Sequence, residues 1–288
     1  MSTRVLSNFD LQVPRDIPEA LDILEKYQDK ITPVAGGSDM LIAWKLGVES
    51  ENAMSVTALP GLDYLTYDDN DGLRIGALAT IDQLLKSDIV KDKYPALWQA
   101  AEIFATHQIK NTATLVGNCL RASPAGDGSA AAYALGATIT FVSKDSGERK
   151  EHIDDLFTGY AQTSRKPNEL ATEISIPAPK AESRSAFIRV TRVNEDLAKL
   201  NVAVYLEVDG ETCIEARLVM GCVGPTLLRL PKCEALLLGS KIDDAILEAV
   251  ANTVNDEISP IDDQRSTAEY RRSVAPVFLK RAILKALA

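Results

Sequence analysis

Apolar residues recur at helical spacing in residues 16–28, DIPEALDILEKYQ, with polar residues on the opposite face. Asp16 is a suitable N-cap and Pro18 falls in the first turn, so the pattern predicts a helix. The β-branched run ITPVA at 31–35 predicts a strand that stops at two glycines. Helix-starting residues follow at once, and a second helix is expected over about 38–46.

The middle of the chain alternates between strand and helix patterns before its periodicity is lost. A strand is predicted at 72–80, a short helix over IDQLLKSDIV and a longer helix at 94–105. From 106 to 128 no period holds, which predicts an irregular loop, and long loops in compact proteins usually serve a function. A helix of small residues, SAAAYALG, and a hairpin closed near 145–147 come next.

Pro177 and Pro179 mark the best candidate boundary between two parts of the chain. Beyond them, the strand patterns AFIRVTRV, LNVAVYLEVDG and TCIEARLVMGCV precede helix patterns, which end in an amphipathic helix after Tyr270. A sheet followed by helices indicates an α+β fold class for this part.

Composition narrows the classes of function. The 288 residues are 46% hydrophobic and 25% charged, as in globular proteins, and the formal net charge of −10 argues against nucleic-acid binding. No apolar run approaches the roughly 20 residues of a membrane span, and the N-terminus lacks a secretory signal pattern, so a cytoplasmic location is expected. The four cysteines stand apart and only two histidines occur, so no metal site is expected in this chain.

The first segment with candidate chemistry is VAGGSD, residues 34–39. Gly36 and Gly37 allow backbone conformations closed to other residues and let a ligand approach closely. Ser38 and Asp39 begin the next helix, whose free N–H groups and positive dipole end suit an anion such as a diphosphate. An ordinary strand-to-helix turn with Ser38 as N-cap is the simpler interpretation of this stretch alone.

The second segment is TATLVGNCLRASPAGDG, which also runs into a helix. Its hydroxyl, amide and carboxylate side chains suit a sugar and phosphates, and an aspartate can accept hydrogen bonds from ribose hydroxyls. A plain surface loop is the alternative. Neither segment is G-x-G-x-x-G or a P-loop, so general nucleotide motifs leave the choice open.

The two segments together resemble the FAD-binding medium subunit of molybdenum hydroxylases of the carbon monoxide, xanthine and nicotinate dehydrogenase type. That family shows A-G-G-S/T-D-L and then I-R-N-x-A-T-I/V-G-G-N-…-S-P-x-x-D; this chain has AGGSDML at 35–41 and IKNTATLVGNCLRASPAGD at 109–127. Further similar blocks are NELATEISIP, FIRVTRVNEDLAKLNVAV, LVMGCVGPTLLR and YRRSVAPVFLKRAI, so the resemblance covers nearly the whole chain.

The resemblance implies a fold. It predicts an α+β protein with a two-part FAD-binding domain of the PCMH/vanillyl-alcohol-oxidase type at 1–178, divided into about 1–55 and 56–178. An α+β C-terminal domain of the carbon monoxide dehydrogenase flavoprotein type is expected at 179–288.

The resemblance also implies the cofactor-binding residues. The expected set is Val34, Ala35, Gly36, Gly37, Ser38, Asp39, Thr114, Val116, Gly117, Asn118, Ser123, Asp127, Glu169, Leu170 and Arg189. The two glycine segments would surround the FAD diphosphate, Asp127 would hold the sugar and Ser123 would order the second loop. Glu169, Leu170 and Arg189 would lie nearer the flavin. Two positions depart from the family, since Val116 replaces the first glycine of G-G-N and Arg189 replaces a common lysine.

A subunit of this kind transfers electrons. The resemblance implies that FAD, bound non-covalently because no histidine or cysteine adjoins AGGSD, accepts electrons from a 2Fe-2S small subunit and passes them to NAD or a quinone. A molybdopterin-binding large subunit would hydroxylate the substrate, and the assembly would be a dimer of heterotrimers. The alternatives are a self-sufficient flavin oxidoreductase of the same FAD fold and an interaction module without flavin.

Overall fold

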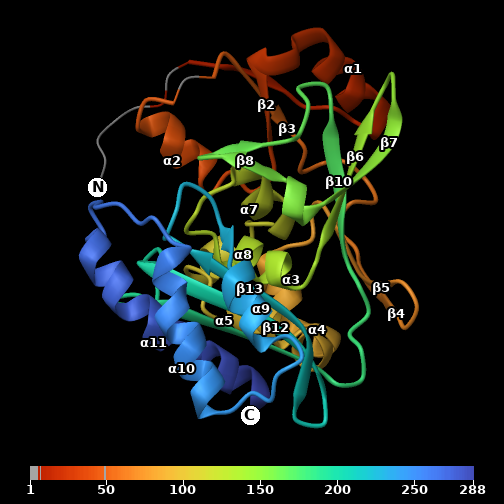
Figure 1. Ribbon diagram of the computed structural model, residues 1–288. Helices are drawn as coiled ribbons and strands as arrows, with labels where there is room; N and C mark the ends of the chain where they lie inside the picture. The colour runs from red at the N-terminus through yellow and green to blue at the C-terminus, as the bar shows by residue number, and fades with distance from the viewer. Residues whose placement is uncertain (1–5, 7, 49) are drawn as a thin grey trace.

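The computed structural model describes residue 6, residues 8–48 and residues 50–288. Its helices and strands are arranged in three layers (Figure 1). A small sheet with α1 lies at the top, a longer antiparallel sheet runs down one side, and a third sheet with its helices fills the bottom. The α+β class is confirmed.

The N-terminal part is a three-stranded parallel sheet with strand order β1-β3-β2. Its elements are β1 (Asp10–Gln12), α1 (Ile17–Tyr27), η1 (Gln28–Lys30), β2 (Ile31–Val34), α2 (Met40–Lys45) and β3 (Asn52–Ser55). Asp16 caps α1 by accepting from the N–H of Glu19 at 2.9 Å, so this predicted helix is confirmed. Leu24, Ile31 and Met54 form a small separate core under the sheet.

A five-stranded antiparallel sheet follows, with strand order β4-β5-β10-β6-β7. Its strands are β4 (Leu65–Asp68), β5 (Gly72–Gly76), β6 (Thr138–Ser143), β7 (Gly147–His152) and β10 (Leu170–Ile176). The predicted hairpin is confirmed as the β6–β7 pair. Because β10 joins β5 to β6, the sheet brings together segments that lie about 100 residues apart in the chain.

Six helices fill the space beside this sheet. They are α3 (Ile81–Lys86), α4 (Asp88–Lys93), α5 (Pro95–Glu102), α6 (His107–Lys110), α7 (Leu115–Arg121) and α8 (Asp127–Ala134). The helices predicted at 94–105 and over SAAAYALG are confirmed as α5 and α8. The helix predicted after residue 80 is two helices, because the Ser87 side chain caps a new start by accepting from Val90 N.

The irregular loop predicted at 106–128 is wrong. Thr106 caps α6 and Thr114 caps α7, each by accepting from the N–H three residues on. These helices have four and seven residues, too few to display a hydrophobic repeat. The segment is therefore mostly helical, with a short turn at 122–126.

The C-terminal part is a four-stranded antiparallel sheet followed by helices, as predicted. Its elements are β11 (Ser183–Val190), β12 (Leu200–Asp209), β13 (Thr212–Gly221), β14 (Leu228–Arg229), α9 (Pro231–Leu237), α10 (Asp244–Thr253), η3 (Val254–Asp256) and α11 (Ala268–Leu287). Before it come η2 (Ile153–Asp155), β8 (Phe157–Gly159) and β9 (Gln162–Thr163). The three C-terminal helices cover one face of the sheet (Figure 1), and β12 and β13 contribute Val202, Val204 and Met220 to the core beneath them.

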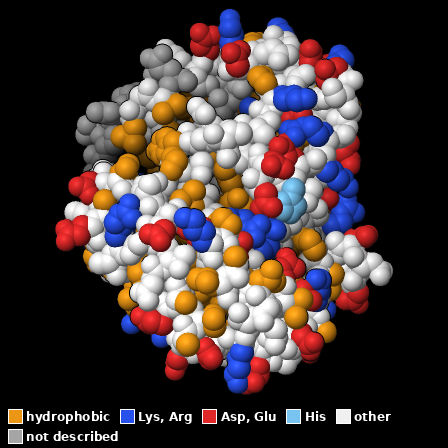
Figure 2. Space-filling view, in the orientation of Figure 1, with side chains coloured by type: hydrophobic (Ala, Val, Ile, Leu, Met, Phe, Trp, Pro, Cys, Tyr) orange, Lys and Arg blue, Asp and Glu red, His pale blue; other side chains and the backbone are white. Residues whose placement is uncertain are grey.

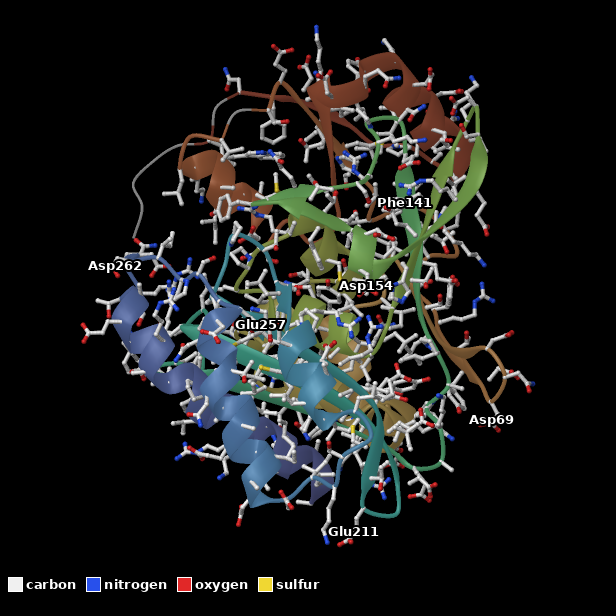
Figure 3. All side chains as sticks on the ribbon, in the orientation of Figure 1. Asp69, Phe141, Asp154, Glu211, Glu257 and Asp262 are labelled. Carbon is white, nitrogen blue, oxygen red and sulfur yellow. The ribbon has the colours of Figure 1, made fainter. Side chains whose placement is uncertain are left out.

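The other face of the C-terminal sheet packs on α5 and α8. Phe187, Ala203 and Val219 from the sheet join the central core that these helices share with the five-stranded sheet. Asp154, marked in Figure 3, accepts from Arg217 of β13 at 2.8 Å at the edge of this contact. Helix α8 is consequently held between the central core and the C-terminal sheet. No helix in the described part of the chain combines the length and apolar character that crossing a membrane requires.

Candidate functional site

The two predicted segments lie against each other. A Cβ on Gly36 would stand 1.9 Å from the carbonyl oxygen of Thr112, so only glycine lets the first loop approach the start of the second. Gly37 has φ +63°, the left-handed region that glycine adopts without strain. Val34 ends β2 and accepts from the N–H of Val56, and Ala35 packs on the N-terminal core. Together these contacts fix where the glycine turn leaves the sheet.

The helix after the glycines begins later than predicted. Its first residue is Met40, and Asp39, rather than Ser38, occupies the N-cap position without capping through its side chain. The Asp39 carboxylate instead accepts from Arg121 Nε at the end of α7, which ties the two segments together by an ion pair. Asp39 therefore belongs to a contact between the loops, and Ser38 as N-cap is wrong.

The glycine turn presents a row of free donors. Among the described residues, the backbone N–H groups of Gly36, Gly37, Ser38 and Asp39 have no protein acceptor. The residues are half-buried except Asp39, which is exposed, so a ligand can reach the turn. Successive backbone N–H groups of this kind form an anion-binding concavity. The turn therefore fits a diphosphate group.

The second segment starts α7 beside this turn. Thr114 is buried and accepts from Gly117 N at 3.0 Å, while Gly117 is itself exposed at the surface. Val116 is buried in the central core with the φ of an ordinary helical residue, so a valine at this position needs no left-handed backbone. Asn118 accepts from Ser129 N at 2.9 Å and so links α7 to the first turn of α8.

A tight turn connects the two helices. Ala122 has φ +49° and ends α7, and the Ser123 hydroxyl accepts from Ala125 N at 3.3 Å. The Gly126 N–H donates to the Ser123 carbonyl at 3.0 Å. Ser123 therefore holds the turn that leads into Asp127.

Asp127 lies at the first position of α8 and is buried with two partners. Its Oδ2 accepts from Arg189 Nη1 at 2.7 Å, and its Oδ1 accepts from Asn201 Nδ2 at 2.9 Å. Burial raises the pKa of the Asp127 carboxyl, and the charge of Arg189 and the bond from Asn201 oppose that rise. Both oxygens accept hydrogen bonds within the chain, so this carboxylate positions the start of α8.

Glu169 and Leu170 belong to a different cluster. Glu169 accepts from Arg149 Nε and Nη2, both at 2.8 Å, and from Lys166 N at 2.8 Å. Burial favours the neutral acid, but these donors hold the pKa of Glu169 below its ordinary value. Leu170 packs into the N-terminal core. The structure thus brings Arg189 to Asp127 and places Glu169 and Leu170 in other contacts.

Three contributing residues were missed from the sequence. Arg121 is the last residue of α7 and had no signal of its own in the sequence. Arg149 lies in a strand of charged residues, GERKEH, that reads as exposed. Asn201 had a usable signal, because an amide inside the apolar run LNVAVYL must find a partner when it is buried.

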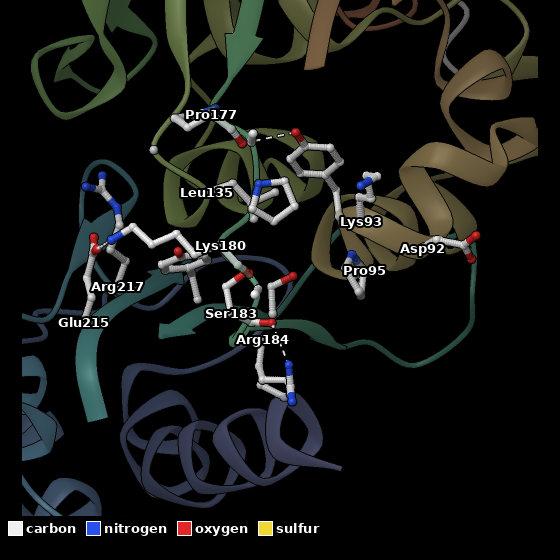
Figure 4. A pocket seen from close by; sticks show the side chains of 18 of the residues that line it. Asp92, Lys93, Pro95, Leu135, Pro177, Lys180, Ser183, Arg184, Glu215 and Arg217 are labelled. Carbon is white, nitrogen blue, oxygen red and sulfur yellow. Dashed lines mark hydrogen bonds and ion pairs between the residues drawn. The ribbon is translucent and has the colours of Figure 1, made fainter. Parts of the chain in front are cut away.

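A cleft of about 720 Å³ opens at the far end of α8, lined by Leu135, Pro177, Lys180 and Arg217 (Figure 4). Lys180 pairs with Glu207 at 2.5 Å and Arg217 with Asp154 at 2.8 Å, so these two cations are already neutralised within the chain. Among the described residues, no group of three or more acidic, histidine or cysteine side chains could hold a metal ion. The candidate site therefore remains the contact between the two glycine segments.

Comparison with known protein families shows to which family this chain belongs. Residues 7–179 match the family described as the FAD binding domain in molybdopterin dehydrogenase, and residues 185–286 match the CO dehydrogenase flavoprotein C-terminal domain. The chain belongs to the FAD-binding medium subunits of the molybdenum hydroxylases. This medium subunit is therefore part of an oxidoreductase, and its cofactor is FAD.

Relatives match the medium subunit over almost its full length. The glyceraldehyde dehydrogenase medium chain of Sulfolobus acidocaldarius is 32% identical, with 92% of this chain and 94% of the relative covered. The nicotinate dehydrogenase FAD-subunit of Eubacterium barkeri is 29% identical, with 96% and 95% covered. A structure of carbon monoxide dehydrogenase from Hydrogenophaga pseudoflava matches with a TM-score of 0.94 at 28% identity, with 98% of each chain covered.

Proposed function

We propose that this medium subunit carries FAD non-covalently, accepts electrons from an iron–sulfur subunit and passes them to an external acceptor such as NAD or a quinone. The observation that carries the proposal is the row of free N–H groups at 36–39 held against the start of α7, within an FAD-binding family. When bound, FAD supplies the redox chemistry, and the protein supplies binding and orientation.

The proposed work of the residues follows from their contacts. The N–H groups from Gly36 to Asp39 hold the diphosphate. Gly117, exposed at the start of α7 and without a side chain, lets the cofactor approach closely. Thr114, Asn118 and Ser123 fix the second segment. Ala35 and Val116 pack into the cores, and Val34 is held by the hydrogen bond from Val56 N. Glu169, held by Arg149, and Leu170, in the N-terminal core, would lie nearer the flavin, and Asp127 with Arg189 sets the start of α8.

The subunit's partners are part of the proposal. We expect a molybdopterin-binding large subunit and a small subunit with 2Fe-2S clusters, assembled as a dimer of heterotrimers in the cytoplasm. Relatives named as medium chains and as an FAD-subunit support this. Hydrophobic side chains are exposed at Leu41 and Ile42 of α2 and at Leu46 just beyond it. Figure 2 shows hydrophobic side chains gathered on the side of the molecule where Figure 1 draws α2. Exposed apolar surface beside the site suits contact with another subunit.

The domain division is likewise proposed. An FAD-binding domain at 1–178, with parts of about 1–55 and 56–178, agrees with the three-stranded sheet ending at Ser55 and the five-stranded sheet ending at Ile176. The C-terminal domain at 179–288 begins just before β11.

Purification tests this proposal. The chain, co-expressed with large and small subunits of this family from the same organism, should form a complex with one FAD per medium subunit. Under anaerobic conditions, glyceraldehyde, nicotinate and carbon monoxide are tried in turn, and a turnover substrate should bleach the visible flavin band in the complex but not in the isolated chain. A complex whose iron–sulfur clusters are reduced by the substrate while its flavin stays oxidised, with NAD and quinones absent, would overturn the proposed electron route.

A further inference from the structure

β12 carries one amide among buried apolar residues. Asn201 is fully buried, and its Nδ2 donates to Asp127 Oδ1 at 2.9 Å and more weakly to the Gly126 carbonyl at 3.4 Å. Both acceptors belong to the start of α8. The Asn201 Oδ1 is buried without a partner among the described residues. Burying an amide costs free energy unless the amide is hydrogen-bonded, so the two bonds to α8 offset the cost of Asn201 in this strand.

The neighbouring strands are shaped to let Asn201 reach the turn. A Cβ on Gly221 of β13 would stand 2.2 Å from Asn201 Oδ1 and 2.6 Å from the Pro124 carbonyl. Next to it, the N–H of Cys222 donates to that same Pro124 carbonyl at 2.8 Å. Glycine at 221 therefore leaves space for both the amide and the turn.

Three strands of the C-terminal sheet thus hold one short turn. Arg189 of β11 and Asn201 of β12 each take one oxygen of Asp127, and Cys222, directly after β13, takes the Pro124 carbonyl. Asn118 of α7 accepts from Ser129 N of α8, so the position of α8 also fixes the position of α7.

We propose that Asn201 is a positioning residue for the flavin site: by holding Asp127 and Gly126 it sets the start of α8, and through Asn118 it sets the start of α7 that faces the glycine turn. Asn201 donates to one oxygen of the Asp127 carboxylate, and Arg189 donates to the other. The C-terminal domain therefore contributes to FAD binding from behind the cofactor loops. This inference rests on the proposed FAD function.

The experiment measures the FAD dissociation constant of the full chain by quenching of flavin fluorescence. Asn201→Ala should raise the constant about tenfold, the loss expected for one hydrogen bond to a charged group. Val202→Ala, the next residue on β12, points into the opposite core and is the control. It should lower the melting temperature and leave the dissociation constant of folded protein unchanged.

Asn201→Asp gives a readout that loss of packing alone cannot produce. When protonated, the introduced carboxyl group donates to Asp127 as the amide does; when ionised, it repels Asp127, and the two acids titrate as a pair. Among the described residues, the charged groups next to this position are Asp127 and its partner Arg189. Burial raises the pKa of the nearby Cys222 thiol to about 12, so this thiol stays protonated at acidic and neutral pH. FAD affinity of this variant should therefore fall as pH rises, whereas wild-type and Asn201→Ala affinities show no such step.

The outcomes separate the two claims. If both Asn201 variants bind FAD as wild type does at every pH, Asn201 has no positioning role, while the proposed function stands. If Asn201→Asp does not fold, Asn201→Ala against Val202→Ala decides, and equal affinities refute the inference. A wild-type chain that binds no FAD overturns the proposed function and this inference with it.

Discussion

The close approach of Gly36 to the second segment gives the sharpest test of the site. In Gly36→Ala the new Cβ would lie 1.9 Å from the Thr112 carbonyl oxygen, whereas real Cβ contacts essentially never fall below 3.0 Å. The two segments must therefore separate by about 1 Å. Forcing a methyl group into such a contact costs roughly 1–3 kcal/mol. Because the proposed diphosphate site needs both segments in place, that cost should appear as weaker FAD binding.

The expected loss is about 5- to 150-fold in the FAD dissociation constant, since 1.4 kcal/mol corresponds to tenfold. Calorimetric titration of the full chain with FAD measures it. Gly61→Ala is the control: its turn has φ +74°, so alanine strains the backbone, but no atom lies within 4 Å of the new Cβ. Gly61→Ala should lower stability by about 1 kcal/mol without changing FAD affinity. If Gly36→Ala binds FAD as tightly as Gly61→Ala does, the two segments do not form the site.

Three further outcomes follow from named contacts. Arg121→Ala should change the free energy of unfolding by less than about 1 kcal/mol, because the pair with Asp39 is partly exposed, yet it should weaken FAD binding in fluorescence titrations. The control is Lys86→Ala, which removes the pair with Asp82 on α3 and should leave FAD affinity unchanged. Equal FAD affinity in both variants refutes the role of Arg121. Glu169 has a lowered pKa, so its stabilisation is present above its unfolded pKa of about 4.3 and is lost as pH falls through the lower folded value. In urea titrations, Glu169→Gln should have a free energy of unfolding about 1–3 kcal/mol lower than wild type at pH 7, and it should lose less of it on acidification. If the free energy of unfolding depends on pH as it does in wild type, the pair of Glu169 with Arg149 has no such role. Leu24→Ala should cost roughly 2–5 kcal/mol, whereas Leu11→Ala, at a side chain 56% exposed, should cost little; similar costs would contradict the N-terminal core.

The sequence predicted elements wherever local chemistry and long-range packing agree. Asp16 caps α1 as its position indicated, and the alternating pattern of β6 and β7 gave the hairpin directly. It failed over 106–128, where α6 and α7 are too short for periodicity and depend on threonine caps and on burial in the central core. The place of β10 between β5 and β6 follows from contacts far apart in the chain, which no local pattern encodes.

For the site, the sequence located both glycine segments but not their joint geometry. The role of Gly36 follows from its distance to Thr112, a contact across more than 70 residues. That Asp127 holds the sugar of FAD stays a prediction, and its buried partners Arg189 and Asn201 were not foreseen. The partners of a buried carboxylate depend on the fold around it, so residue type alone could not predict them.

FAD titration of the isolated wild-type chain is the decisive experiment for the flavin site. We predict saturable binding of one FAD per chain, with a rise in melting temperature that grows with FAD concentration as mass action requires. A correctly folded chain whose melting temperature and heat of mixing do not respond to FAD would contradict this prediction.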